Sequence, residues 1–255
     1  MCCFEKLIFQ KQKFVLMPDL FLDIETAPIF TKEEYFQTKE KIDSGMLGRD
    51  SENRDLFWRF DRGGLTPFDG KVILITYQIN NGHVFRLKEW ETGEKAMLKK
   101  FYDLVVDLQR GSGSDRLKII GHNILRFDLF FIYNRMKHHK IEDEKWLHQW
   151  IINKPEVIDF LQTHLPLNDF KTKGLRHDVL AHAYGFPVKS TLGSGEIPHY
   201  FQGDYGKIIE YSEREFIYPE LYKKIISQGT ISKKELLDSI KHYEEMQNVK
   251  KESSS

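Results

Sequence analysis

The stretch that decides the fold is LFLDIETAP, residues 20–28. It begins as an apolar strand, yet Asp23 and Glu25 place two acids inside it. Side chains alternate between the two faces of a strand, so these acids point the same way, about 6.5 Å apart. Burial penalises an ionised carboxylate, and two neighbours repel each other. A divalent cation would relieve both costs, because hard ions favour carboxylate oxygens. The alternative is a pair of acids at a solvent-exposed strand end.

A third acid follows about a hundred residues later, in IIGHNILRFDLFF, residues 119–131. The apolar residues at its start predict a strand, and Asp128 falls in the first turn of the helix expected next. An acid there can simply complement the helix dipole. The carboxyl end of a buried strand is, however, where α/β sheets usually place their sites. We expect Phe127, Phe130 and Phe131 to surround Asp128 with an apolar wall.

The composition bounds the class of protein. The chain has 255 residues, of which 40% are hydrophobic and 30% charged, so it is long enough to bury a sizeable core. Basic and acidic residues number 38 each, which argues against a protein that coats nucleic acid by charge alone. Cys2 and Cys3 provide neither a disulfide framework nor a zinc-ligand spacing. No apolar run is long enough to span a membrane, and we expect a cytoplasmic protein.

Periodicity and turn residues predict the remaining elements. Apolar runs predict a strand over 71–79, a hairpin turn at 80–82 leading into 83–90, and strands over 117–123 and 156–161. Helical spacing predicts helices over 92–109, 126–139 and 173–185, a long one beginning near Asp204, and a last one capped by Ser232. Residues 31–43 are helix-compatible, and 57–70 are expected to be irregular. This order predicts an α/β fold with a mixed sheet and covering helices.

Together, FLDIETAP and IIGHNILRFDLFFIYNR resemble the first two motifs of the DEDD superfamily of 3′–5′ exonucleases. The closest resemblance is to the tyrosine-type branch related to the proofreading domain of family-B DNA polymerases, and it spans roughly residues 18–226. It implies a ribonuclease H-like fold, with a central mixed β-sheet flanked by α-helices. The exonuclease domain would cover 18–228, with an excursion at about 31–70. An extension or edge strand (1–17) would precede it, and a C-terminal helix and tail (229–255) would follow.

The third motif of that family is Tyr-x-x-x-Asp on a late helix. In this chain the spacing gives Tyr211 and Glu215, a glutamate in place of the aspartate. Positions i and i+4 share one helical face, so ring and acid can face the same site. Tyr200 and His199 also have a matching spacing to Asp204. We set them aside because Pro198 and Gly203 predict a poor helix, and because Asp204 suits the start of the next one.

The resemblance implies a metal-dependent 3′–5′ exonuclease acting on nucleic acid with a free 3′ end, with single-stranded DNA favoured and RNA as the alternative. It also implies two divalent cations, Mg²⁺ or Mn²⁺, held by the four acids of the motifs, with Tyr211 orienting the attacking water. We expect Thr26, Asn123 and Phe127 to contact the substrate. The ligand set would be Asp23, Glu25, Asp128 and Glu215. Because glutamate replaces the aspartate, a catalytically weakened protein that binds nucleic-acid ends or a protein partner is the other reading.

Basic and aromatic residues alternate in the excursion. Arginines at 49, 54, 59 and 62 are interleaved with Phe57, Trp58 and Phe60. Such a pattern can stack unpaired bases beside phosphate-binding cations. A solvated amphipathic segment is the other interpretation.

Overall fold

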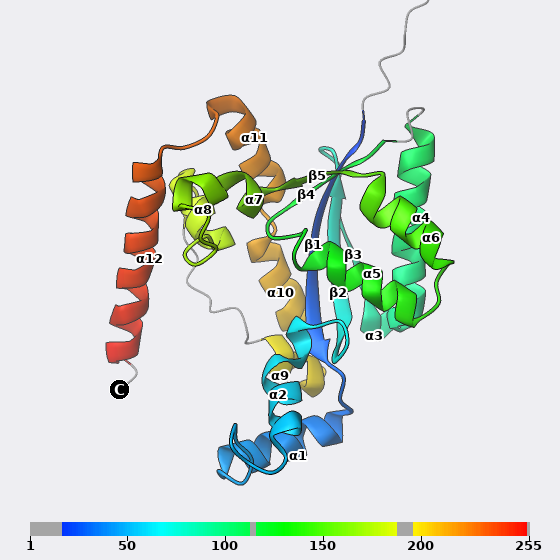
Figure 1. Ribbon diagram of the computed structural model, residues 1–255, viewed down its shortest axis with the longest axis vertical. Helices are drawn as coiled ribbons and strands as arrows, with labels where there is room; N and C mark the ends of the chain where they lie inside the picture. Colours follow the sequence, from blue (N-terminus) through cyan, green and yellow to red (C-terminus); the bar gives the residue numbers. More distant parts are fainter. Residues whose placement is uncertain (1–16, 113–115, 188–195, 254–255) are drawn as a thin grey trace, which may run out of the picture.

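The computed structural model describes residues 17–112, 116–187 and 196–253. Its centre is a five-stranded mixed sheet in the order β3-β2-β1-β4-β5 (Figure 1). The strands are β1 (Asp19–Pro28), β2 (Gly70–Ile79), β3 (Val84–Lys88), β4 (Lys118–Gly121) and β5 (Glu156–Asp159). The central strand β1 pairs antiparallel with β2 and parallel with β4. The α/β class with a mixed sheet flanked by helices, predicted from the sequence, is confirmed.

Helices surround this sheet on both faces. The first half of the chain forms α1 (Lys32–Asp43), α2 (Arg54–Arg62), the short turn η1 (Gly63–Leu65), α3 (Glu89–Thr92), α4 (Glu94–Gly111) and α5 (Asp128–His138). The middle forms α6 (Glu144–Leu147), η2 (His148–Asn153), α7 (Phe160–His164), η3 (Leu165–Asn168) and α8 (His177–Ala183). The last part forms α9 (Glu196–Gln202), α10 (Tyr205–Glu215), α11 (Tyr218–Gln228) and α12 (Lys233–Ser253).

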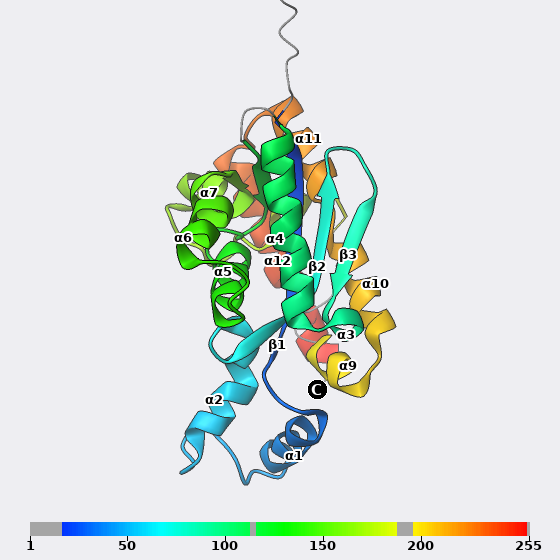
Figure 2. The ribbon, with the colours of Figure 1, turned by 90° about the vertical axis from the view of Figure 1, so that its right-hand side faces the viewer.

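The alternation along β1 builds two separate cores. Leu20, Leu22 and Ile24 pack with residues of α4 and α5 on one face of the sheet. Phe21, on the other face, packs with residues of α8 and α11. Figure 1 shows α4 and α5 on one side of β1 and α8, α10 and α11 on the other, and Figure 2 shows α4 in front of the sheet with α12 behind it. Asp23 and Glu25 follow Phe21 at alternate positions and therefore lie on the face covered by α8, α10 and α11.

Two predicted segments differ from the structure. Residues 57–70 were expected to be irregular, but α2 covers 54–62 and η1 covers 63–65, so irregular backbone begins only after Leu65. The region around Pro198 was expected to be a poor helix, but α9 begins before it and ends at Gln202. Proline is tolerated in a first helical turn, where its missing N–H has no helical partner, and Gly203 ends the helix with a φ of 82°.

The long helix expected from Asp204 is in fact two helices. α10 ends at Glu215 and α11 begins at Tyr218, with Pro219 in its first turn. Proline has no N–H to donate, and inside a helix its ring clashes with the carbonyl four residues earlier, here that of residue 215. The helix therefore cannot run through Pro219, and a new one starts with Pro219 in its first turn. Asp204 does stand at the start of α10, although its side chain makes no capping hydrogen bond there.

The C-terminal helix α12 is more than a solvated surface. Ser232 caps it as predicted: the Glu235 N–H donates to the Ser232 hydroxyl, and the Glu235 carboxylate accepts from the Ser232 N–H. Leu236 is fully buried against Leu161 and Leu175. The helix therefore braces α8 and the loop before it.

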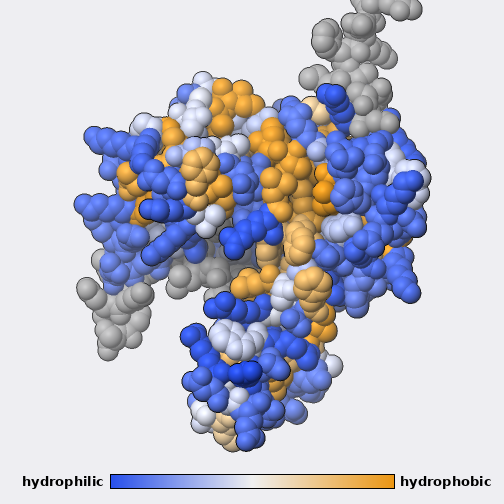
Figure 3. All heavy atoms as spheres, viewed as in Figure 1, coloured by the Kyte–Doolittle hydropathy of each residue, from blue (hydrophilic) through white to orange (hydrophobic). Residues whose placement is uncertain are grey.

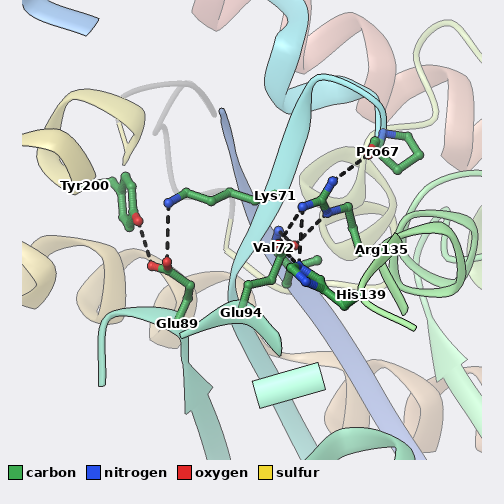
Figure 4. Close-up of polar contacts among 8 residues, drawn as sticks. All are labelled: Pro67, Lys71, Val72, Glu89, Glu94, Arg135, His139 and Tyr200. Atoms are coloured by element: carbon green, nitrogen blue, oxygen red, sulfur yellow. Dashed lines mark hydrogen bonds and ion pairs between the residues drawn. The ribbon is translucent and has the colours of Figure 1, made fainter. Parts of the chain in front are cut away.

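A buried ion pair fixes α5 against α4. Arg135 of α5 donates two hydrogen bonds to the Glu94 carboxylate, at 2.9 and 2.7 Å, and a third to the Pro67 carbonyl (Figure 4). Glu94 also accepts from the Val72 N–H of β2 at 2.8 Å and contacts His139 at 2.7 Å. One carboxylate thus joins two helices and a strand, and it holds the helix that begins with Asp128.

The helices α1 and α2 extend from the body of the molecule (Figure 1). Arg59 lies over the Phe30 ring at 4.6 Å and donates to the Ile29 carbonyl, so it anchors α2 to the end of β1. Trp58 has two arginine guanidinium groups near its ring, those of Arg49 and Arg62, at 5.5 and 5.0 Å. Much of the basic and aromatic pattern is therefore used in contacts within the protein.

Over the described residues, no helix combines the length and the apolar character that crossing a membrane would require. On the face seen in Figure 3, apolar residues form a strip over the middle of the molecule, bordered by hydrophilic ones. A groove separate from the candidate site is lined mainly by apolar residues such as Leu125, Phe130 and Ile152. Phe130 is 45% exposed there, so the expectation that it walls in Asp128 is wrong.

Candidate active site

A cavity of about 500 Å³ lies where β1, the carboxyl end of β4 and the start of α5 meet α8 and α10. Three of the predicted acids line it, namely Asp23, Glu25 and Asp128. So do three further predicted site residues, Asn123, Phe127 and Tyr211. Segments from three distant parts of the chain therefore meet here. The catalytic and binding roles of these residues are still predictions.

Asp128 is held directly beside Asp23. Its side chain is 4% exposed, and its Oδ1 accepts a hydrogen bond from the Ile24 N–H at 3.0 Å. Burial raises the pKa of Asp128 well above its ordinary value, and the neighbouring charge of Asp23 raises it further. The hydrogen bonds from backbone N–H groups act in the opposite direction and do not offset these effects. Asp128 is buried and Asp23 is half-buried, so their mutual repulsion disfavours the state in which both carboxyl groups are ionised.

The loop that carries Asn123 is shaped by another buried acid. Asp159, at the end of β5, is 2% exposed and accepts hydrogen bonds from three backbone N–H groups. They belong to Asn123, Leu125 and Leu161, at 2.7, 3.1 and 2.9 Å. Asn123 adopts a φ of 60°, a left-handed conformation that asparagine tolerates better than most residues. Asp159 thus has a structural role in positioning this edge of the cavity.

Tyr211 reaches the cavity because α10 is fixed across the sheet. Its neighbour Ser212 is fully buried and hydrogen-bonds the Thr76 hydroxyl at 2.7 Å. Thr76 lies directly opposite Asp23 in the β1–β2 register, so this pair aligns α10 with the strand that carries the first acid. Glu215 ends α10, and the structure describes its backbone but not its side chain.

A second tyrosine, which sequence reasoning missed, touches the site. The Tyr218 hydroxyl donates to Asp23 Oδ1 at 2.8 Å. The ring is 4% exposed and packs edge-on against Phe160, Phe216 and His177. The helix break after Glu215 is what places Tyr218 here. Pro219, which follows Tyr218, was the available signal, because proline favours the first turn of a helix.

Other predicted residues lie elsewhere. Thr26 is not part of the cavity lining, and its hydroxyl donates to the Gly64 carbonyl, which ties η1 to β1. The alternative third motif is also remote: the Tyr200 hydroxyl donates to Glu89, which pairs with Lys71 (Figure 4). His199 lies 3.5 Å from Asp204, outside the cavity lining. Neither pair faces Asp23.

The donor chemistry of the cavity fits a hard divalent cation. Asp23, Glu25 and Asp128 line one cavity, and a cation there would offset the repulsion that, after burial, raises the pKa of Asp128. Within the part of the chain that the structure describes, no group of three or more His, Cys, Asp or Glu side chains lies close enough together to hold a metal ion. The Glu215 side chain falls outside that description. The acids thus fit the ion in type, without forming a closed ligand set.

Comparison with solved structures finds similarity to a crystal structure of the zinc-bound complex of Escherichia coli exonuclease I with single-stranded DNA. The sequence identity is 13% and the TM-score is 0.39, over 83% of this chain and 43% of that one. This chain thus corresponds to less than half the length of that protein. No family model matches the chain, and no curated protein matches it. The functional proposal therefore rests on the residues that line the cavity.

Proposed function

We propose that this protein is a metal-dependent 3′–5′ exonuclease that removes nucleotides from the free 3′ end of a single strand, with DNA preferred. The observation that carries the proposal is the shared cavity of Asp23, Glu25, Asp128 and Tyr211. Two segments about a hundred residues apart supply the acids, and a third supplies the tyrosine. Such a convergence of carboxylates suits phosphodiester hydrolysis at a free end.

Each residue has a distinct part in this proposal. Asp23, Glu25 and Asp128 would hold Mg²⁺ or Mn²⁺, completed by Glu215. When bound, two such ions stabilise the charge that develops on the attacking and leaving oxygens of an in-line displacement. The Tyr211 hydroxyl would orient the attacking water. Asn123 and Phe127 contact the terminal nucleotide from the loop that Asp159 holds.

The first prediction concerns the reaction itself. The full chain, incubated with a 5′-labelled single-stranded oligonucleotide and Mn²⁺ or Mg²⁺, is expected to give a ladder that shortens from the 3′ end. EDTA stops the reaction, and DNA and RNA of equal length compare the two substrates. Denaturing gels measure the products.

A catalytically weakened protein that binds nucleic-acid ends or a protein partner is the second candidate. It is favoured by Glu215 in place of the motif's aspartate and by the lack, among the described residues, of three acids close enough to hold a metal ion. Binding of the oligonucleotide with no ladder in either ion, and equal binding by Asp23→Ala, would establish it in place of the enzyme.

The second prediction separates the two tyrosines. Tyr218→Phe keeps the buried ring but removes the hydrogen bond that orients Asp23, so we expect Mn²⁺ affinity to fall by about 10- to 100-fold, as for other groups that orient metal ligands. Tyr211→Phe, the matched control, is expected to lower the rate and leave Mn²⁺ affinity close to that of the parent. Isothermal titration calorimetry measures the affinity. Equal Mn²⁺ affinity in Tyr218→Phe and the parent would remove Tyr218 from the site.

A further inference from the structure

The cavity that holds the acids is also lined by cations. Arg126, Lys173 and Arg176 line the same cavity as Asp23 and Asp128. Arg126 comes from the loop before α5, and the other two come from the loop before α8. Arg126 and Lys173 are both exposed at its surface. Arg126 lies within the second motif stretch, two residues before Asp128, whereas Lys173 and Arg176 lie outside both motifs.

The loop that carries Lys173 has a fixed backbone. The Asn168 side chain, 8% exposed, donates to the carbonyls of Lys171 and Lys173 at 2.6 and 2.9 Å. Gly174 has a φ of 91°, and a Cβ there would lie 3.2 Å from the Ile240 side chain of α12. A side chain at position 174 would therefore be strained, and α12 can pack closely against the loop. A fixed loop lowers the entropy that Lys173 loses when it binds a ligand.

The Arg176 side chain is also held in place. Its guanidinium lies 5.1 Å from the centre of the Tyr243 ring of α12 and contacts Asp178 at 3.1 and 3.4 Å. The side chain is still 48% exposed, and Arg176 lines the cavity. Guanidinium groups bind phosphate oxygens in pairs, and ordering them beforehand adds to that preference. Asp178 neutralises part of this charge, which leaves Arg126 and Lys173 as the main sources of positive potential.

We propose that Arg126, Lys173 and Arg176 form a phosphate-binding subsite for the strand upstream of its 3′ terminus. This rests on the proposed function, because the end of the strand must reach the acids. The acids repel the next phosphate along the chain, whereas these three cations attract it. Because phosphates are alike at every step, the subsite adds affinity without sequence preference.

The test measures binding of the full chain to a 5′-fluorescein oligothymidylate by anisotropy, in EDTA so that no cleavage occurs. Lys173→Ala is expected to raise the Kd by about 5- to 10-fold for every sequence and to reduce the slope of log K against log salt by about 0.7. Lys171→Ala, two residues away and outside the cavity lining, is the matched control and should match the parent. Arg126→Ala, on a separate loop, should reproduce the effect of Lys173→Ala.

An oligonucleotide with an uncharged methylphosphonate at the penultimate linkage completes a double-mutant cycle. The parent should bind this oligonucleotide more weakly than the unmodified one, by a factor similar to the effect of Lys173→Ala. Lys173→Ala should bind the modified and unmodified oligonucleotides with nearly equal affinity. Unchanged affinity and salt slope in both Lys173→Ala and Arg126→Ala would overturn the subsite. If the parent shows the Lys173-dependent slope and cleaves nothing with Mn²⁺, the subsite stands and the exonuclease proposal alone fails.

Discussion

Asp128→Asn is expected to lower the rate of hydrolysis by about 10²–10³-fold while making the ion-free protein more stable. The asparagine carbonyl can still accept the Ile24 N–H, so the local geometry is preserved. The change removes a buried ionisable group and its repulsion with Asp23, the two causes that raise the pKa of Asp128. Activity would therefore fall while stability rises. This is the expected result where a functional site is maintained at the expense of stability. Single-turnover assays and urea unfolding at neutral pH measure the two quantities.

Asp159→Asn is the matched control, because Asp159 is equally buried but accepts three backbone N–H groups. An asparagine has one acceptor oxygen, and its NH₂ group would face an N–H donor. We expect the free energy of unfolding to fall by about 1–3 kcal/mol. A loss of stability in Asp128→Asn as large as in Asp159→Asn would mean that Asp128 has a structural role. Its assignment as a functional acid would then be wrong.

The sequence predicts the sheet well because its signals are local. The alternation in β1 separates an apolar face from the face of Asp23 and Glu25, and the turn at Asn80 predicts the β2–β3 hairpin that forms. Asp128 begins α5 as its position after a strand predicts. Each of these features depends on neighbours within a few residues, which is the range over which periodicity and capping act.

The contacts that the sequence does not predict join residues far apart along the chain. Tyr218 meets Asp23 only because α10 ends three residues earlier, and Arg176 meets Tyr243 only because α12 folds back over α8. A tyrosine in an apolar helix looks the same whether its hydroxyl faces water or a carboxylate. Tertiary packing decides which of the two the hydroxyl faces, so a pattern of residue types along the chain cannot predict it.

Glu94→Ala is expected to reduce the free energy of unfolding by about 3–5 kcal/mol, the largest effect on stability that we predict. The substitution leaves Arg135 charged at 4% side-chain exposure and the Val72 N–H without its acceptor. Arg135 belongs to the helix that begins at Asp128, so loosening α5 should also lower activity. Urea unfolding at pH 7 measures the loss. Lys99→Ala, which breaks an exposed ion pair with Asp103 on the same helix, is the control and should cost less than about 1 kcal/mol.

The same carboxylate predicts how stability depends on pH. Burial raises the pKa of Glu94, but the hydrogen bonds from Arg135 and His139 outweigh it, so the pKa lies below its ordinary value of 4.5. A lowered pKa in the folded state means that the unfolded chain binds more protons on acidification. The stabilisation is therefore complete above about pH 4.5 and is lost as the pH falls through the folded-state pKa. Glu94→Gln has no carboxyl group to protonate at this position. Its free energy of unfolding, measured in urea, should therefore lie below that of the parent by an amount that shrinks from pH 5 to pH 3. A deficit that stays constant over that range would mean that the ion pair does not set the pKa of Glu94.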